Sequence, residues 1–376
     1  MPKIGILSSV HQALDPRIFY REARSLRRSG YEVTVIAQHD RDEIVDEISI
    51  QALPRTPRWR RPLLWFTLLR RALASRADAF QFHDPELLLV VPWLRLLTGK
   101  PTIYDVLESH ADFIRIKTYL PAWLRRPVAR LFAVAEPWLA RCHNGLLFAD
   151  DRIAETFASL RCPKATLFNY PESDFVRQAL EQTRGRGYAP VVLHLGGHEV
   201  SRGTALMVEA FERVARARPE ARLLLVGPFF PPSLEQEMRA DIARRGLTHA
   251  VTITGPVPFT QVGDYLRQAS VGWWAAQPVA KYEKNIPTKI FEYMAYGCAV
   301  VSSDLQPVRP FIQPGRNGYL ARPDDPAAHA QAILELLDHP EKARAMGQLG
   351  QEWVSARYNW DEMEKRLLAF YAQVLS

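Results

Sequence analysis

Short apolar runs alternate with amphipathic segments along the whole chain, and polar or glycine-rich loops separate them. The first apolar run, residues 3–8, predicts a strand. An amphipathic helix follows it, with Asp15 as the expected cap and Pro16 as the first helical residue, and a second strand is predicted over 32–37. This strand–helix–strand order predicts a parallel sheet that binds its ligands at the carboxyl ends of the strands.

The same alternation continues toward the C-terminus. Further strands are predicted over 79–82, 102–105, 145–149, 191–195, 222–226, 251–254, 271–275 and 298–301. Apolar periodicity is lost between 172 and 189, where Arg184-Gly185-Arg186-Gly187 is typical of a linker. We therefore expect an α/β protein with two doubly wound parallel-sheet domains, residues 1–172 and 190–357, and a linker over 173–189.

Length and composition agree with this division. With 376 residues, 47% of them hydrophobic, the chain can bury two cores of ordinary size. The three cysteines, Cys142, Cys162 and Cys298, have no metal-like spacing and indicate a reducing compartment without a disulfide framework. We identify neither a cleavable leader nor an apolar run of membrane-spanning length, and expect a cytoplasmic protein.

Positive charge is concentrated in the first half of the chain. The net charge is +7, with 25 Lys and Arg against 20 Asp and Glu in residues 1–175, and 23 against 21 in the remainder. The excess predicts an anionic partner for the first half. Nothing in the sequence resembles a nucleic-acid-binding module, so we expect no nucleic acid among the partners.

One segment, Arg55–Arg76, contains seven arginines and no acidic residue, interleaved with Trp65, Phe66 and several leucines. Such an apolar face flanked by guanidinium groups suits peripheral contact with an anionic membrane surface. It equally suits a helix packed on the first sheet with solvated arginines. A second basic cluster, Arg125 to Arg130 beside Trp123, favours the membrane interpretation if it lies on the same side.

Polar side chains follow three strand ends of the first half and form a candidate set. They are His11 and Arg17 after the first strand, His83 after 79–82, and Asp105, Glu108 and His110 around the end of 102–105. Capping accounts for Asp15, whereas His11 and Arg17 have no evident local role. Strand-end capping by Asp105 and a hydrogen-bonded structural histidine at 83 are the alternatives.

In the second half, a glycine-rich loop follows the strand over 191–195. Gly196 and Gly197 allow a ligand to approach the backbone closely. Arg202, at the end of this loop, can bind phosphate oxygens through two parallel hydrogen bonds. A glycine-rich loop alone is weak evidence, and it gains weight from the segment described next.

The most informative stretch is Lys281–Gly297, which reads as a polar loop, a short helix and a glycine stop. Pro287 is the expected first helical residue, which leaves the amides of Thr288 and Lys289 free at the positive end of the helix. A phosphate group would bind there. Glu292 lies one helical repeat after Thr288, where its carboxylate can accept hydrogen bonds from the two hydroxyls of a ribose. The predicted ligand is a nucleoside diphosphate.

This stretch, in the form Pro-x-Lys-x-x-Glu-Tyr-Met-Ala-x-Gly, resembles the donor-binding signature of retaining GT-B glycosyltransferases of glycosyltransferase family 4. Gly196–Gly203 and Asp15–Phe19 resemble the same family, and the likeness extends over nearly the whole chain. Three positions depart from the family pattern. Lys284 stands in place of the first of two glutamates, Leu107 in place of a histidine, and Gly197 in place of an arginine.

The resemblance implies the GT-B fold, two Rossmann-like domains facing a central cleft, with the helix over 358–376 crossing back to the N-terminal domain. It implies transfer of a hexose from a nucleoside diphosphate sugar, the co-substrate, to a hydroxyl of a glycan, lipid-linked or small-molecule acceptor. The implied donor residues are Gly196, Gly197, Arg202, Val257 at the nucleobase, Pro287, Thr288, Lys289 and Glu292. The implied acceptor-side residues are His11, Arg17, His83, Asp105 and Glu108.

We expect Arg202 and Lys289 to stabilise the departing diphosphate, with His110 as a further catalytic candidate. No Asp-x-Asp triplet occurs, and we expect neither a metal nor another cofactor. The family implies a role in cell-surface polysaccharide or glycoconjugate synthesis. The departures also fit a donor-binding but inactive scaffold subunit, and a nucleotide-sugar epimerase would share the fold.

Overall fold

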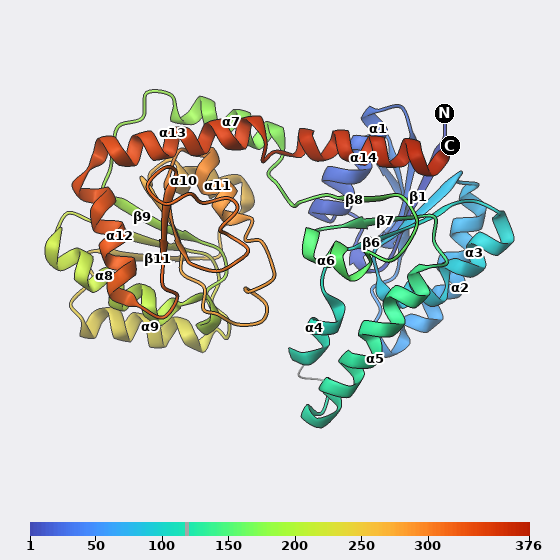
Figure 1. The fold of residues 1–376 in the computed structure, drawn as a ribbon, viewed down its shortest axis with the longest axis horizontal. Coiled ribbons are helices and arrows are strands. Elements are labelled where there is room, and N and C mark those ends of the chain that lie inside the picture. The colour runs from blue at the N-terminus through green and yellow to red at the C-terminus, as the bar shows by residue number, and fades with distance from the viewer. Residues whose placement is uncertain (117–119) are drawn as a thin grey trace. The chain divides into compact units, whose positions relative to one another are not determined.

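The computed structural model describes residues 1–116 and 120–376, except for the side chains of Arg58, Ile116 and Phe259. The chain forms two compact α/β units (Figure 1). The first comprises Met1–Asn169 and Trp360–Ser376, and the second comprises Tyr170–Asn359. The last helix therefore belongs to the first unit, which holds both termini.

An eight-stranded sheet forms the centre of the first unit, in the order β3-β4-β2-β1-β5-β6-β7-β8. Its strands are β1 (Lys3–Gln12), β2 (Glu32–Gln38), β3 (Glu43–Val45), β4 (Ile48–Leu53), β5 (Ala79–Phe82), β6 (Thr102–Val106), β7 (Gly145–Phe148) and β8 (Lys164–Thr166). Every neighbouring pair is parallel except the edge pair of β3 and β4. The carboxyl ends of β1, β5 and β6 consequently meet at one edge, as the strand–helix–strand order predicted.

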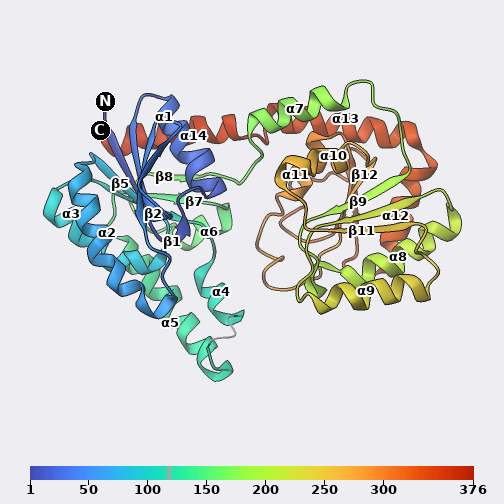
Figure 2. The same ribbon diagram turned by 180° about the vertical axis from the view of Figure 1, so that it is seen from behind.

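Helices cover both faces of this sheet (Figure 2). They are η1 (Pro16–Ala23), α1 (Arg24–Arg28), α2 (Arg61–Ser75), α3 (Val91–Thr98), α4 (His110–Ile116), α5 (Ala122–Ala140), α6 (Asp151–Thr156) and α14 (Trp360–Leu375), with short turns η2 (Arg58–Arg60) and η3 (Pro85–Leu89). Leu68 of α2, Leu94 of α3 and Ala140 of α5 share one core with the sheet. Successive strand residues face opposite sides. Gly145, beside Leu146 of that core, leaves room for Phe370 of α14 on the other face.

The second unit has a six-stranded, all-parallel sheet in the order β11-β10-β9-β12-β13-β14. Its strands are β9 (Val191–Leu195), β10 (Arg222–Val226), β11 (Val251–Gly255), β12 (Val271–Trp274), β13 (Ala299–Ser303) and β14 (Gly318–Ala321). Its helices are α7 (Ser173–Thr183), α8 (Thr204–Ala217), α9 (Ser233–Arg244), α10 (Val262–Leu266), α11 (Lys289–Ala295), α12 (Pro326–Asp338) and α13 (Pro340–Ala356), with turns η4 (Val200–Arg202) and η5 (Phe259–Gln261). The strands are mostly apolar because helices cover both faces.

The linker predicted over 173–189 is wrong for most of its length. Residues 173–183 form α7, which belongs to the second unit. Only Val176 and Ala179 of this helix are buried, since α7 lies on the outside of the unit and needs just a narrow apolar stripe. Such a stripe is too weak in the sequence to distinguish a surface helix from a linker.

Candidate functional site

The glycine-rich loop after β9 has the geometry of a ligand cradle. Gly196 has φ of +131°, a conformation that favours glycine. A Cβ atom at Gly227, which follows β10, would lie 2.1 Å from the carbonyl oxygen of Gly196, so the two backbones touch. A Cβ atom at Gly196 would lie 3.0 Å from Nη1 of Arg202 and 3.9 Å from Cε of Lys289. The structure thus brings together three residues that the sequence assigned to one diphosphate.

Two side chains hold the guanidinium of Arg202 by its Nε atom. Nε donates to the hydroxyl of Tyr282 at 2.9 Å and lies 3.3 Å from Oε1 of Glu199. The Tyr282 hydroxyl donates in turn to Glu199. Burial opposes ionisation of Glu199, but the hydrogen bond from Tyr282 and the charges of Lys281 and Arg202 lower its pKa. Sequence reasoning missed both residues, although Glu199 stands three positions before Arg202.

Helix α11 begins later than predicted. Its first residue is Lys289 and its cap is Thr288, so Pro287 precedes the helix instead of opening it. The side chains of Lys289 and Glu292 pair with each other, Nζ lying 2.8 Å and 3.0 Å from the two carboxylate oxygens. The three-residue spacing on one helix face accounts for this pair. A diphosphate that attracts Lys289 would leave the carboxylate of Glu292 open to other donors.

Tyr293 fixes α11 against the sheet directly behind this site. Its hydroxyl accepts a hydrogen bond from the amide of Leu195 at 2.8 Å and donates to the carbonyl of Trp273 at 3.3 Å. A Cβ atom at Gly272 would lie 2.2 Å from the Tyr293 ring, so only glycine permits this approach. Tyr293 therefore has a structural role: it holds α11 in place, and so fixes the positions of Lys289 and Glu292 relative to the end of β9.

Two histidines that the sequence analysis did not select lie buried beside the loop. Nδ1 of His194 donates to the carbonyl of Trp273, 2.9 Å away, and the ring centroid of His194 lies 5.1 Å from that of His198. Burial lowers the pKa of His194 to about 4, and the charges of Arg202 and Lys289 add to this effect. Burial also lowers the pKa of His198, to about 2. Both rings are neutral and therefore add no positive charge to the site.

The remaining donor-side residues lie in neighbouring loops. Val257 lies two residues after the end of β11 and is half-buried. Gly197 lies under the ring of Phe230, since a Cβ atom there would be 3.1 Å from that ring. This contact explains physically why no long side chain stands at Gly197.

In the first unit, Arg17, His83 and Asp105 come together but are buried. Arg17 binds Asp105 at 3.0 Å and 3.2 Å and Glu22 at 2.9 Å, and it donates to the carbonyl of Leu167 at 2.7 Å. His83 Nε2 lies 3.1 Å from Glu22 and 3.3 Å from Asp105. The expectation that Arg17 has no local role is therefore wrong, because it pairs with two buried carboxyl groups.

Strong pKa shifts accompany this cluster. Burial disfavours the charged form of His83, yet its hydrogen bonds and ion pairs with Asp105 and Glu22 raise its pKa to about 10. Burial likewise opposes ionisation of Asp105, but the charges of Arg17 and His83 lower its pKa. Ligand atoms of Glu22, His83 and Asp105 lie within 4.8 Å of one another, as in a metal site. Burial and the charge of Asp105 raise the pKa of Glu22. Arg17 and His83 already pair with the carboxylates of this cluster.

The other first-unit candidates are more accessible. Both ring nitrogens of His11 face carboxylates at 3.6 Å, Nδ1 toward Asp15 and Nε2 toward Asp84. His110 pairs through Nδ1 with Glu136 at 2.7 Å and is only partly exposed. The carboxylate of Glu108 is half-buried and has no partner in the described part of the chain.

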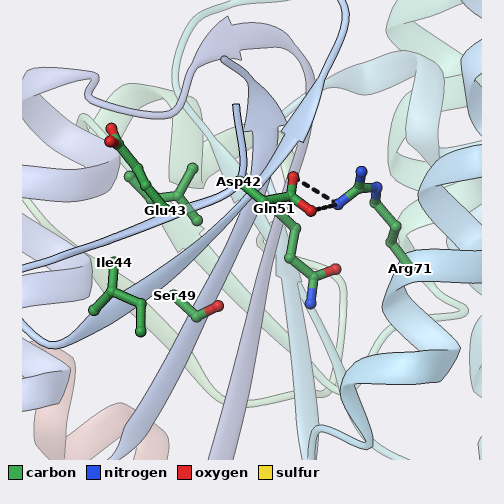
Figure 3. Close-up of a pocket in the computed structure, with 7 residues that line it drawn as sticks. Asp42, Glu43, Ile44, Ser49, Gln51 and Arg71 are labelled. Atoms are coloured by element: carbon green, nitrogen blue, oxygen red, sulfur yellow. Dashed lines mark hydrogen bonds and ion pairs between the residues drawn. The ribbon is translucent and has the colours of Figure 1, made fainter. Parts of the chain in front are cut away.

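An open hollow of about 440 Å³ lies elsewhere, at the sheet edge formed by β3 and β4 (Figure 3). Asp42 and Arg71 close one side through hydrogen bonds of 2.8 Å and 2.9 Å. None of the predicted donor or acceptor residues lines it. The convergence of charged and glycine residues, not this hollow, therefore defines the candidate site.

Comparison with known proteins decides the family. Residues 17–171 match the family described as "Glycosyl transferase 4-like domain", and residues 189–339 match "Glycosyl transferases group 1". Together the two matches extend over most of the chain. The chain is a GT-B glycosyltransferase of group 1.

Curated relatives of this glycosyltransferase act on varied substrates. It is 28% identical over 94% of its length to the phosphatidyl-myo-inositol mannosyltransferase of Mycobacterium leprae, of which 91% is covered. It is 24% identical to the alpha-D-kanosaminyltransferase of Streptomyces kanamyceticus, over 81% of this chain and 79% of that protein. These relatives indicate glycosyl transfer from nucleotide sugars and leave the individual substrates open.

Solved structures confirm the fold. The sucrose-phosphate synthase of Thermosynechococcus elongatus superposes with a TM-score of 0.74 at 18% identity, covering 100% of this chain and 99% of its own. Anabaena HepE in complex with UDP gives a TM-score of 0.73 at 14% identity, covering 99% and 100%. At these identities the likeness concerns the fold alone. The GT-B fold expected from the sequence is therefore confirmed.

Among the described residues of this glycosyltransferase, no helix is both long enough and apolar enough to cross a membrane.

Proposed function

We propose that this glycosyltransferase moves a hexose from a nucleoside diphosphate sugar to a hydroxyl of a glycan, lipid-linked or small-molecule acceptor, with retention at the anomeric carbon and without a metal. The observation that carries the proposal is the convergence of Gly196, Arg202 and Lys289. Two cations beside a glycine-rich loop fit a diphosphate. The pKa values of His194 and His198 are lowered, so the positive charge there comes from Arg202 and Lys289.

The chemistry assigned to these residues is electrostatic. Cleavage of the bond between the anomeric carbon and the diphosphate oxygen leaves negative charge on that oxygen, and preorganised cations lower the barrier. Arg202 is preorganised by its two Nε partners, which leaves Nη1 and Nη2 for phosphate oxygens. Lys289 would exchange Glu292 for phosphate on binding. The freed carboxylate would then accept the ribose hydroxyls, as proposed from the sequence.

Nucleotide binding is the first test. Thermal unfolding is measured with UDP, GDP and ADP and with their hexose conjugates, because solved neighbours of this fold include complexes with UDP and with UDP-glucose. A nucleotide at a hundred times its dissociation constant stabilises the folded protein by about 2.7 kcal/mol. Failure of every nucleotide to shift the transition would contradict the donor-site assignment. Product analysis by NMR with the stabilising donor then reports retention or inversion.

A second candidate is a donor-binding scaffold subunit without turnover. The departures from the family pattern at Lys284, Leu107 and Gly197 favour it. Both candidates predict nucleotide binding, so turnover separates them. Release or transfer of labelled sugar by the pure protein, abolished by Arg202→Ala, would exclude the scaffold.

The same proposal assigns the protein to glycoconjugate or cell-surface polysaccharide synthesis, in the cytoplasm or at the inner face of the membrane. The basic Arg55–Arg76 segment supports contact with anionic lipid. Within it, Arg61 lies 3.5 Å from Glu86 and Arg71 binds Asp42, while the side chain of Arg58 lies outside the described residues. Arginines alone are therefore a weaker basis for membrane contact than the sequence indicated.

A further inference from the structure

Exposed apolar side chains are concentrated on one part of the first unit. Among the described residues, eighteen large apolar side chains are exposed, and twelve of them lie between 59 and 138. The twelve, each from 40% to 76% exposed, are Trp59, Leu63, Phe66, Leu73, Leu89, Trp93, Leu96, Leu97, Trp123, Leu131, Val134 and Trp138. We call these residues the apolar face. It includes every strongly exposed tryptophan among the described residues.

The apolar face is built from the outer sides of three helices. Trp59, Leu63 and Phe66 recur at four- and three-residue spacing along η2 and α2, and Leu131, Val134 and Trp138 recur in the same way along α5. Helix α3 contributes Trp93, Leu96 and Leu97 in the same manner. The two views in Figures 1 and 2 agree that α2, α3 and α5 lie on one side of the eight-stranded sheet.

The core of the unit does not need these side chains. The inner sides of the same helices already pack on the sheet through Leu68 and Ala72 of α2, Val91 and Leu94 of α3, and Ala140 of α5. Isolated exposed apolar residues are ordinary, whereas a run over three neighbouring helices marks an interaction surface. Helices α1 and α14, on the opposite side of the sheet, contain none of the eighteen.

Charge on these helices selects the kind of partner. They contain seven arginines, Arg61, Arg70, Arg71, Arg95, Arg125, Arg126 and Arg130. Their one acidic residue, Glu136, is buried against Tyr104 and His110. Three of the arginines, Arg70, Arg126 and Arg130, are exposed and have no acidic partner in the part of the chain that the structure describes.

We propose that the apolar face inserts into the interfacial layer of an anionic membrane, with α2, α3 and α5 lying in the plane of the surface. Tryptophan prefers this layer because its ring is apolar and its N–H remains hydrated. Arginines beside the inserted side chains meet the lipid phosphates. The inference rests on the proposed function in one respect: membrane insertion would bring the enzyme to a lipid-linked acceptor. The physical argument for insertion does not depend on donor binding.

Insertion differs from attraction of a basic helix in its response to salt. Electrostatic attraction is screened over about 10 Å at 0.1 M salt and about 3 Å at 1 M. Burial of apolar surface persists at high salt. We expect the protein to cosediment with phosphatidylglycerol-containing vesicles at low salt and to keep a clear fraction of that binding at high salt. Quenching of tryptophan fluorescence by brominated lipid should accompany it.

Two sets of variants separate the apolar contribution to vesicle binding from the electrostatic contribution. Trp93→Gln/Leu97→Gln on α3 and Trp123→Gln/Trp138→Gln on α5 should each weaken vesicle binding by about tenfold and remove the salt-resistant part. The triple variant Arg70→Glu/Arg126→Glu/Arg130→Glu should remove the salt-sensitive part. All seven side chains are exposed, so folding should be unchanged. Ile44→Gln/Leu180→Gln and Arg213→Glu/Arg316→Glu/Arg344→Glu are the matched controls elsewhere on the chain.

Several outcomes would overturn the proposal. They are absence of vesicle binding at low salt, or equal binding by the wild type and the α3 and α5 variants. Concentration-dependent dimerisation in analytical ultracentrifugation, abolished by those variants, would identify the face as a contact between copies instead. The thermal shift with nucleotide is measured on every variant. Normal nucleotide binding without vesicle binding contradicts the insertion alone, and the reverse result contradicts the donor site alone.

Discussion

The hydroxyl of Tyr282 lies 2.9 Å from Nε of Arg202, and it donates its own proton to Glu199. Tyr282 belongs to the loop before α11, whereas Arg202 ends the loop after β9. The contact therefore joins the two segments that the sequence assigned to the donor. It also fixes the guanidinium plane through the one nitrogen that phosphate does not need.

Loss of this contact should reduce catalysis more than folding. In Tyr282→Phe, the ring remains and the Nε partner is lost, which should lower kcat by about tenfold, the effect of one hydrogen bond to a charged group. KM for the donor should change less, because the arginine charge stays in the site. Steady-state kinetics measure both. Tyr188→Phe, which removes a hydroxyl bonded to the carbonyl of Leu336, is the control, and equal kinetics in both variants would contradict a positioning role.

Arg202→Ala and Glu292→Ala should fail in different ways. In the proposed mechanism Arg202 stabilises charge that grows during bond cleavage, so its loss should lower kcat by roughly a hundredfold or more. Glu292 is assigned to the ribose in every state, so its loss should raise KM with a smaller change in kcat. Arg202→Lys retains a point charge and should recover part of the rate. Wild-type kinetics in either alanine variant would remove that residue from the site.

The sequence predicted most of the strands well, because these depend on local patterns. Apolar strands, the cap at Asp15 and the glycines at 196 and 203 are readable from neighbouring residues. The cap is observed, since Asp15 accepts from the amides of Arg17 and Ile18 at 2.8 Å and 3.1 Å. What failed depends on distant contacts. Arg17 looked free until Asp105, 88 positions later, proved to be its partner.

The same reasoning explains the missed site residues. Tyr282 and Glu199 are ordinary polar residues in loops, and only the fold brings them to Arg202. Pro287 was placed inside α11 because proline favours the first helical turn, but the helix starts two residues later at Lys289. Which apolar side chains are exposed could not be predicted from the sequence either. Helices α3 and α5 have apolar residues on more than one side, and only their packing on the sheet determines which side is buried.

Buried charges give the first unit a distinct dependence on pH. The pKa of His83 is raised from 6.5 to about 10, so its contribution to stability is complete below pH 6.5 and is lost as the pH rises toward 10. The pKa of Asp105 is lowered from 3.8, so its contribution is present above pH 4 and is lost as the pH falls. Removal of one partner of a buried ion pair costs about 3–5 kcal/mol. His83→Gln should lose this amount at pH 7, measured by urea unfolding.

The difference between His83→Gln and the wild type should shrink above pH 10, where the wild-type imidazole is also neutral. His339→Gln is a suitable control, because this histidine is exposed. A constant difference between pH 7 and pH 11 would show that packing, not the charge of His83, sets the stability. Tyrosine and lysine titrate in the same range, but they do so in both proteins and cancel in the comparison.

The last prediction concerns Gly197, where the family has an arginine. Its backbone is not in the left-handed region, so a side chain is allowed there, but the Phe230 ring would lie 3.1 Å from the new Cβ. Gly197→Arg alone should therefore destabilise the loop and weaken donor binding.

In Gly197→Arg/Phe230→Ala the ring is gone, and a second guanidinium gains access to the diphosphate. A hydrogen bond between charged groups contributes about 1.5–3 kcal/mol, so nucleoside diphosphate affinity should rise about tenfold or more over Phe230→Ala alone. Isothermal titration calorimetry of the two proteins measures this difference. Equal affinities would mean that the loop after β9 directs its side chain at 197 away from the phosphates, and that Arg202 and Lys289 account for the site's cationic contacts.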